Sequence, residues 1–254
     1  MELKFADRMD LFKEGIFTTL ANIKKERIKE NKPVFDLSVG TPDFLPEPHV
    51  VNALVEAAKI PENFKYAITD TDEMLEAVQN WYKRRYDVEL EKDEIMSLYG
   101  SQEGISRVAL TIANPGDTVL VPNPGYPVFE LGPLLNDAHI EYYELREENN
   151  YLIDFDSIPE EVAKKAKAII VSYPANPICR LAPVSFYKEL IAWANKYNVI
   201  VLHDNAYSEL VYDGKRGISF LSVEGAKEIG IEFNSLSKTY NLTGARISFA
   251  VGNK

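Results

Sequence analysis

Four short runs rich in valine, isoleucine and leucine constrain the fold of this chain most strongly. They cover residues 117–122, 167–174, 198–204 and 231–237, and helical or polar segments separate them. In these runs apolar residues are nearly continuous instead of occupying every second position. Strands that helices cover on both faces have this pattern. The runs therefore predict an α/β fold with a mostly parallel sheet sandwiched by helices.

Segments with helical spacing come before and between these runs. Apolar residues recur at helical intervals over residues 14–30, 48–59 and 72–86. Pro33 prevents the first helix from continuing, because proline breaks the helical hydrogen-bond ladder. Residues 34–44 should therefore be extended and lead through Gly40 into a loop.

Charge and composition exclude several classes of function. A net charge of -11 leaves no basic face for nucleic acid or for an anionic membrane. Cys179 is the single cysteine, so an internal disulfide is excluded, and three scattered histidines give no metal-ligand spacing. We find neither an apolar run of about 20 residues nor the pattern of a secretion signal. We expect a cytosolic protein with no metal, no membrane and no nucleic-acid partner.

Polar side chains stand where the predicted strands end. Asn176 follows one strand, Asp204 ends another and Lys238 follows a third. Ligands of parallel sheets bind at such ends. A lysine amine can form a Schiff base with an aldehyde, and enzymes dependent on pyridoxal phosphate (PLP) pair that lysine with a carboxylate at the ring nitrogen. The phosphate would then be bound by Ser235, Ser237 and Arg246.

Each candidate also has an ordinary structural interpretation. Gly100, followed by Ser101 and Gln102, could bind a phosphate at a helix N-terminus, but glycine before a helix is more often a plain turn. Asp204 could be a helix cap, and Tyr207 could be a half-buried core tyrosine. A lone lysine is usually a solvated surface charge. Local patterns leave these alternatives open.

The segment from Ser235 to Arg246 has the pattern S-x-S-K-x-x-x-x-x-G-x-R. With it, the sequence resembles the class I/II aminotransferases of the fold type I PLP-dependent enzymes. The resemblance covers nearly the whole chain, in the family's order, through DLSVGTPDF, GSQEG, NPGD, VPNPGYPVF, SYPANP, HDNAYSELVYDG and NSLSKTYNLTGAR. KRRYDVEL, IPEEVAKKAK and HDNAYSE indicate the subgroup of LL-diaminopimelate aminotransferase-like proteins.

The resemblance implies a role for each matched residue. Lys238 would form the Schiff base and transfer protons, and Asp204 would pair with the pyridine nitrogen. Tyr207 and Asn176 would contact the phenolic oxygen of the ring, and Tyr126 would stack on its face. The residues that match the phosphate-binding group are Ser101, Gln102, Ser235, Ser237 and Arg246.

Further implications concern the partner, the substrate and the domains. Tyr66 matches a tyrosine that reaches the phosphate of the partner subunit, which implies a homodimer, and Gly40 matches a backbone position beside the substrate carboxylate. Residues 1–45 would form an N-terminal arm with part of a small domain, and residues 46–254 the PLP-binding large domain. We expect the C-terminal small domain, with the arginine that binds the substrate's α-carboxylate, to be absent.

The implied function is transfer of an amino group between an amino acid and a 2-oxo acid. The sequence departs from the family where Ile178 and Cys179 replace the usual Thr-Gly and Ala245 replaces the usual tryptophan. Two alternatives stay open. One is a PLP lyase with the same site, and the other is a PLP-binding but catalytically weak fragment or partner subunit.

Overall fold

The computed structural model describes residues 3–12 and 14–254, and the chain divides into two compact units, residues 1–43 and 44–254. The first unit contains a 3-10 turn, η1 (Asp7–Leu11), and helix α1 (Ile16–Lys29). The chain after α1 forms neither helix nor strand up to residue 43. Within this unit, Lys24 Nζ donates a hydrogen bond to Asp36 Oδ2 at 2.8 Å. The helix predicted over 14–30 is confirmed.

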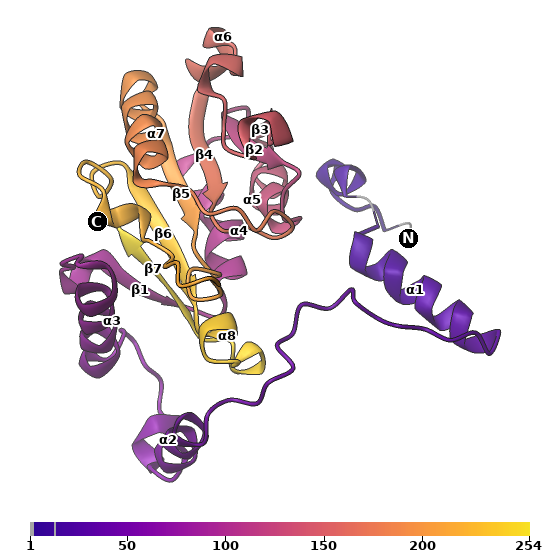
Figure 1. Ribbon diagram of the computed structural model, residues 1–254, viewed down its shortest axis with the longest axis vertical. Helices are drawn as coiled ribbons and strands as arrows, with labels where there is room; N and C mark the ends of the chain where they lie inside the picture. The colour runs from indigo at the N-terminus through magenta and orange to yellow at the C-terminus, as the bar shows by residue number, and fades with distance from the viewer. Residues whose placement is uncertain (1–2, 13) are drawn as a thin grey trace. The chain divides into compact units, whose positions relative to one another are not determined.

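The second unit is built on one mixed sheet (Figure 1). Its strands follow the order β1-β7-β6-β5-β4-β2-β3; β7 pairs antiparallel with both β1 and β6, and the other pairs of described strands are parallel. The bounds are β1 (Ile95–Leu98), β2 (Thr118–Asn123), β3 (His139–Glu144), β4 (Ala166–Ser172), β5 (Ile200–Asp204), β6 (Gly230–Ser235) and β7 (Ser248–Gly252). The predicted α/β fold with a mostly parallel sheet is confirmed.

The helices of the second unit begin and end at local signals. They are α2 (Pro48–Ala58), α3 (Asp72–Tyr86), α4 (Ser101–Ile112), α5 (Val128–Leu135), α6 (Glu160–Ala163), α7 (Val184–Tyr197) and α8 (Leu236–Thr239). Helix α3 begins after Thr71, whose hydroxyl accepts a hydrogen bond from the Met74 backbone, and ends at Asp87 in the left-handed conformation. In the described residues, no helix combines the length and apolar character needed to cross a membrane.

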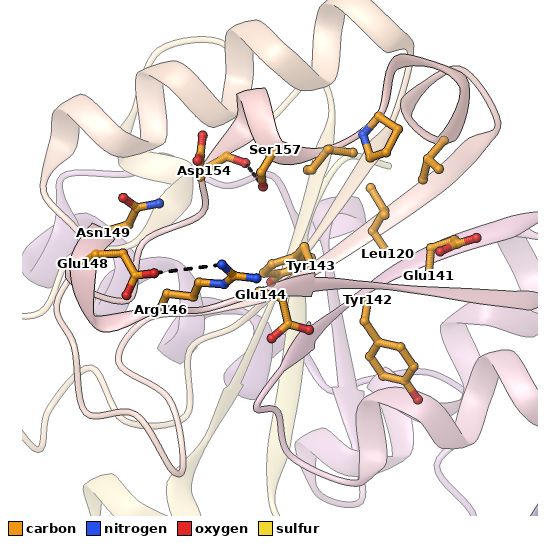
Figure 2. A pocket seen from close by; sticks show the side chains of 13 residues that line it. Leu120, Glu141, Tyr142, Tyr143, Glu144, Arg146, Glu148, Asn149, Asp154 and Ser157 are labelled. Atoms are coloured by element: carbon orange, nitrogen blue, oxygen red, sulfur yellow. Dashed lines mark hydrogen bonds and ion pairs between the residues drawn. The ribbon is translucent and has the colours of Figure 1, made fainter.

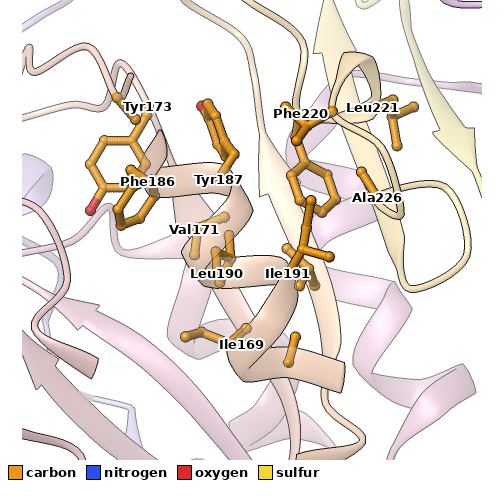
Figure 3. Close-up of a cluster of buried hydrophobic side chains, with 14 of the residues drawn as sticks. Ile169, Val171, Tyr173, Phe186, Tyr187, Leu190, Ile191, Phe220, Leu221 and Ala226 are labelled. Carbon is orange, nitrogen blue, oxygen red and sulfur yellow. The ribbon is translucent and has the colours of Figure 1, made fainter. Parts of the chain in front are cut away.

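Two hydrophobic cores cover the two faces of the sheet. Residues of one strand alternate between them: Ile169 and Val171 of β4 join one core, whereas Ala168 and Ile170 join the other. Helices α3 and α7 supply the first core, part of which Figure 3 shows, and α4 and α5 supply the second. Both faces are therefore buried, which explains the continuous apolar runs.

The central parallel strands bring polar residues to one edge of the sheet. Ser172 at the end of β4 pairs with Asp204 at the end of β5, and Asp204 pairs with Phe233 of β6. The run predicted as a strand over 231–237 leaves the sheet after Ser235. The Ser235 hydroxyl accepts a hydrogen bond from the Ser237 backbone and so caps α8. This short helix carries Lys238.

Candidate active site

Asp204 forms a buried acidic centre at the end of β5. Asp204 is 7% exposed, and this burial raises the pKa of its carboxyl group from 3.8 to about 6. No described group lies within hydrogen-bonding distance of its Oδ1. A buried carboxylate oxygen without a donor costs free energy, so Asp204 is suited to a ligand that brings a donor or a positive charge.

Lys238 and Tyr207 lie close to one another at the same edge. Lys238 Nζ lies over the Tyr207 ring, 5.9 Å from its centroid. Burial and the positive charge of Arg246 lower the pKa of Lys238, while burial and the charge of Asp204 raise the pKa of Tyr207. The Tyr207 hydroxyl also shares a hydrogen bond with the Asn176 side chain. The structure thus brings together four of the five residues predicted around the lysine and the ring, which are Lys238, Tyr207, Asn176 and Asp204.

Gly100 and Arg246 lie in close contact at the start of α4. A Cβ atom on Gly100 would lie 2.1 Å from Arg246 Nη2, and the φ of Gly100 is +95°. The positive φ therefore favours glycine here, and the absence of a Cβ leaves room for the guanidinium group. Ser101 begins α4 directly after this glycine, so the backbone N–H groups of a helix start and a guanidinium group adjoin each other.

Ser235 and Ser237 are buried beside this group. The Ser235 hydroxyl accepts hydrogen bonds from the Ser237 backbone at 3.2 Å and from the Ser248 hydroxyl at 2.9 Å. A hydroxyl has two acceptor positions and one hydrogen to donate. With both acceptor positions used, the Ser235 hydrogen is the group that can still bind an anion.

Tyr126 stands between α4 and α5. Gln102 Nε2 donates a hydrogen bond to its hydroxyl at 2.8 Å, and Phe129 packs edge-on against its ring with centroids 6.2 Å apart. The negative charge of an ionised Tyr126 is among the groups that raise the pKa of Tyr207, so the two phenols lie near one another. The aromatic face is half-buried and fixed in direction.

The sequence also predicted two further site residues, Tyr66 and Gly40. Tyr66 follows the 3-10 turn η2 (Pro61–Phe64) and its side chain is fully exposed, at 101%. Gly40 belongs to the first unit and is exposed. The roles of both residues stay predictions.

Sequence reasoning missed the residues that support the predicted ones from neighbouring strands. The Ser172 hydroxyl donates to the Asp204 carbonyl at 2.9 Å, and Ser248 of β7 holds Ser235. Behind Asp204, on the other face of the sheet, His203 and Glu232 form a buried pair. A histidine and a glutamate inside otherwise apolar runs were the signal that could have indicated this pair.

A cavity of about 440 Å³ lies against β3 (Figure 2). Its lining is mostly polar and acidic and includes Glu141, Glu144, Glu148 and Asp154, with Arg146 as the cation. None of the residues predicted from the sequence to bind cofactor or substrate lines it. The cavity is therefore separate from the cluster around Lys238.

Comparison with known proteins identifies the family. Residues 32–254 match the model of the aminotransferase class I and II family. The chain belongs to this family. The predicted resemblance to class I/II aminotransferases is confirmed, and the matched segment contains every residue of the cluster around Lys238.

Individual members of the aminotransferase family are similar over nearly the whole chain. An LL-diaminopimelate aminotransferase of Aquifex aeolicus is 47% identical over 99% of this chain and 65% of its own length, and one of Dehalococcoides mccartyi is 41% identical with the same coverage. A substrate-bound structure of BacF from Bacillus subtilis has a TM-score of 0.93 and 35% identity, and covers 100% of this chain and 64% of its own. The chain thus spans about 65% of the length of these relatives.

Proposed function

We propose that this chain is the cofactor-binding part of a PLP-dependent aminotransferase, which moves an amino group between an amino acid and a 2-oxo acid. The observation that carries the proposal is the lysine at the sheet edge. Lys238 has a lowered pKa and adjoins Tyr207, and Asp204, a buried carboxylate whose Oδ1 lacks a donor, ends the neighbouring strand β5. Family membership supports the same function.

The residues present fit PLP at both ends. The unsatisfied Oδ1 of Asp204 suits a protonated pyridine nitrogen, because each would satisfy the other in a buried place. At the opposite end, the α4 start, Arg246 and the free hydrogen of Ser235 suit a phosphate. When bound, PLP would supply the electron sink that stabilises the carbanion of the amino acid.

The chain's own residues would position the reactants and move the proton. Because its pKa is lowered, Lys238 Nζ is more often neutral and can accept the proton of the substrate's Cα and return one later. Asp204 would hold the ring nitrogen protonated, while Tyr207 and Asn176 would orient the ring by its phenolic oxygen. Tyr126 would cover one face of the ring and exclude water.

We propose the substrate from the names of the relatives and the assembly from the match at Tyr66. Since the two relatives described above are LL-diaminopimelate aminotransferases, we propose LL-diaminopimelate as the amino donor. We also propose a homodimer, in which the exposed Tyr66 reaches the phosphate bound by the partner subunit. The cytosolic location predicted from the sequence belongs to the same proposal.

Chemical labelling tests the cofactor assignment. The protein is incubated with PLP, reduced with borohydride and digested, and the pyridoxyl label is located by mass spectrometry. We expect one label at Lys238, and its loss in Lys238→Arg. A label distributed over many surface lysines would contradict the assignment.

Product analysis tests the reaction. The protein is incubated with LL-diaminopimelate and 2-oxoglutarate, and glutamate is measured. Glutamate formation is expected from an aminotransferase, whereas other products from the same donor indicate a lyase. A label at Lys238 without amino transfer favours the alternative of a PLP-binding but catalytically weak chain.

A further inference from the structure

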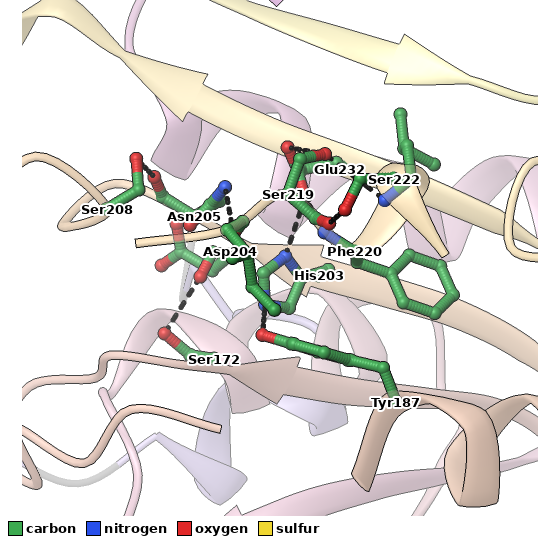
Figure 4. A network of polar contacts seen from close by, with 12 residues as sticks. Ser172, Tyr187, His203, Asp204, Asn205, Ser208, Ser219, Phe220, Ser222 and Glu232 are labelled. Carbon is green, nitrogen blue, oxygen red and sulfur yellow. Dashed lines mark hydrogen bonds and ion pairs between the residues drawn. The ribbon is translucent and has the colours of Figure 1, made fainter. Parts of the chain in front are cut away.

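A buried network of polar side chains lies on the far side of the sheet from Asp204 (Figure 4). Its centre is Glu232 of β6, which is fully buried. Four donors contact its carboxylate: the Tyr82 hydroxyl at 2.7 Å, the Phe220 backbone at 2.8 Å, the Ser219 hydroxyl at 2.9 Å and His203 Nδ1 at 3.0 Å. These donors come from three segments of the second unit, which are α3, β5 and the turn at residues 219–220.

Glu232 is built to carry a negative charge. Burial by itself would raise the pKa of Glu232, but the hydrogen bonds from His203 and Tyr82 and the charge of His203 hold it below its usual value. Each carboxylate oxygen accepts two hydrogen bonds. An ionised carboxylate accepts about four, so Glu232 is saturated in the charged form.

His203 can hold one proton or two without moving a heavy atom. Its Nδ1 faces Glu232 and must carry a hydrogen, because an ionised carboxylate only accepts. Its Nε2 lies 3.2 Å from the Tyr187 hydroxyl of α7. A neutral imidazole accepts from that hydroxyl, whereas an imidazolium donates to its oxygen. The two states therefore differ by the rotation of one hydroxyl hydrogen.

His203 is next to Asp204 in the chain, and the two side chains point to opposite faces of β5. The groups around Asp204 are the Ala206 backbone N–H, the Tyr207 phenol, His203 and Glu232. Burial raises the pKa of Asp204 most, a protonated His203 lowers it, and the charge of Glu232 raises it by less. The charges of His203 and Glu232 therefore act on Asp204 in opposite directions.

We propose that Tyr187, His203 and Glu232 form a buried proton site that keeps Asp204 ionised as the pH falls. When His203 carries a second proton, its imidazolium places a positive charge next to Asp204. The resulting positive charge opposes protonation of Asp204, so Asp204 stays ready for a protonated ring nitrogen. His203 is a positioning residue, because it acts through Asp204. The role in cofactor binding rests on the proposed function. The effect of His203 on the pKa of Asp204 does not depend on that function.

The pH dependence of ligand binding tests this role. The probe is pyridoxamine 5′-phosphate, which has the ring and the phosphate of PLP but no aldehyde to react with Lys238. We compare its Kd for wild type and His203→Gln from pH 9 to pH 6. The titration of the probe itself is common to both proteins and cancels in the ratio of the two Kd values.

We expect equal affinities at pH 9 and a ratio that rises as the pH falls, toward about tenfold for each unit by which the pKa of Asp204 increases. A purely structural role of His203 would change the affinity by the same factor at every pH. A ratio that does not depend on pH overturns the inference.

Two further variants act as a weaker test and as a control. Tyr187→Phe keeps the ring but leaves Nε2 without a partner, and an unpaired charged donor costs more than an unpaired neutral acceptor. We expect the ratio of its Kd to that of wild type to rise as the pH falls, but by less than for His203→Gln. This variant replaces His203→Gln as the test if His203→Gln does not fold. Ser219→Ala removes one donor to Glu232 but no titratable group. The ratio of its Kd to that of wild type should therefore stay constant with pH.

A measurement without any ligand separates this inference from the proposed function. The ¹³C carboxyl signal of Asp204, identified by its loss in Asp204→Asn, is titrated in the cofactor-free protein. We expect its midpoint at a higher pH in His203→Gln than in wild type, and equal midpoints contradict the inference. A wild-type protein that binds no pyridoxamine phosphate but shows the shift would contradict only the proposed function.

Discussion

The two ends of the proposed cofactor site are built in opposite ways. At the ring end, Asp204 is 7% exposed and stands in front of a saturated buried network around Glu232. At the phosphate end, Gln102 and Arg246 are exposed, and the Arg246 guanidinium donates to the Thr243 carbonyl at 2.9 Å. Charges in the buried end are weakly screened, whereas those at the exposed end are strongly screened by water and salt.

This difference assigns different tasks to the two ends. A buried carboxylate with one oxygen that lacks a donor favours either protonation or a positive partner, so the ring end selects a charge state. An exposed guanidinium at a helix start contributes only a small amount of binding free energy, and its side chain can shift to fit the ligand. We therefore expect changes at the ring end to affect the reaction most, and changes at the phosphate end to affect mainly affinity.

Removing the charge of Asp204 should have the largest effect. Loss of one partner of a buried ion pair costs about 3–5 kcal/mol, which corresponds to a decrease of about 10² to 5 × 10³-fold in the rate of the first half-reaction. Asp204→Asn keeps the shape of the side chain, and the conversion of PLP to its amino form is followed by absorbance. Asp154→Asn, an exposed aspartate outside the site, should react like wild type. Full activity of Asp204→Asn would remove Asp204 from the ring end.

The same variant should stabilise the cofactor-free protein. The folded-state pKa of about 6 exceeds the ordinary 3.8, so ionisation opposes folding above pH 6, and this cost vanishes below about pH 4. The shift corresponds to about 3 kcal/mol, from which the unpaired amide of the new side chain subtracts about 1–2 kcal/mol. We expect Asp204→Asn to raise the free energy of unfolding by about 1–2 kcal/mol at pH 8. Urea unfolding at pH 8 and pH 4 checks this, and a gain of equal size at both values would contradict it.

Gly100→Ala should weaken the phosphate end by a smaller amount. The new Cβ meets the end of the flexible Arg246 side chain, which can move away, while the positive φ of 95° strains the backbone. Gly116 has a φ of +85° and nothing within 4 Å of a Cβ, so Gly116→Ala is a matched control. Both variants should lose about 1–2 kcal/mol of stability. Only Gly100→Ala should also raise the Kd for pyridoxamine phosphate, by roughly three- to tenfold, and equal Kd values for the two variants would exclude Gly100 from the site.

The elements that the sequence predicted are those with strong local patterns. The four apolar runs became β2, β4, β5 and β6, and the helices predicted over 48–59 and 72–86 became α2 and α3. Strand β3, with polar residues at most of its positions, was not predicted, because it forms the sheet edge and is only partly buried. Local patterns were therefore sufficient for the central parallel strands, but neither for the edge strand β3 nor for β7, which lies inside the sheet between β1 and β6.

For the site, the sequence could indicate residues next to strand ends but not those that support them from other strands. Lys238, Asp204 and Tyr207 follow or end apolar runs, which placed them at one edge. The contact between His203 and Glu232 depends on the register of β5 against β6, across 29 positions of sequence. Nothing in the sequence fixes that register before the sheet forms, so the network behind Asp204 became visible only in the structure.

Tyr126 should give the smallest effect, because it contributes contact area and no charge. Its hydroxyl is bonded to Gln102 at the exposed side, while the ring would stack on the cofactor. Tyr126→Phe should therefore bind pyridoxamine phosphate nearly as wild type does, whereas Tyr126→Ala should lose about 0.5–1.5 kcal/mol, or roughly two- to tenfold in Kd. Gln102→Ala separates the hydrogen bond from the ring: if its Kd changes as much as that of Tyr126→Ala, the ring is not the platform. Because stacking on a neutral ring is insensitive to ionic strength, the loss in Tyr126→Ala should be the same in low and high salt, whereas any contribution from Arg246 should decrease as salt is added. A loss in Tyr126→Ala that disappears in high salt would place Tyr126 at the phosphate end instead of over the ring.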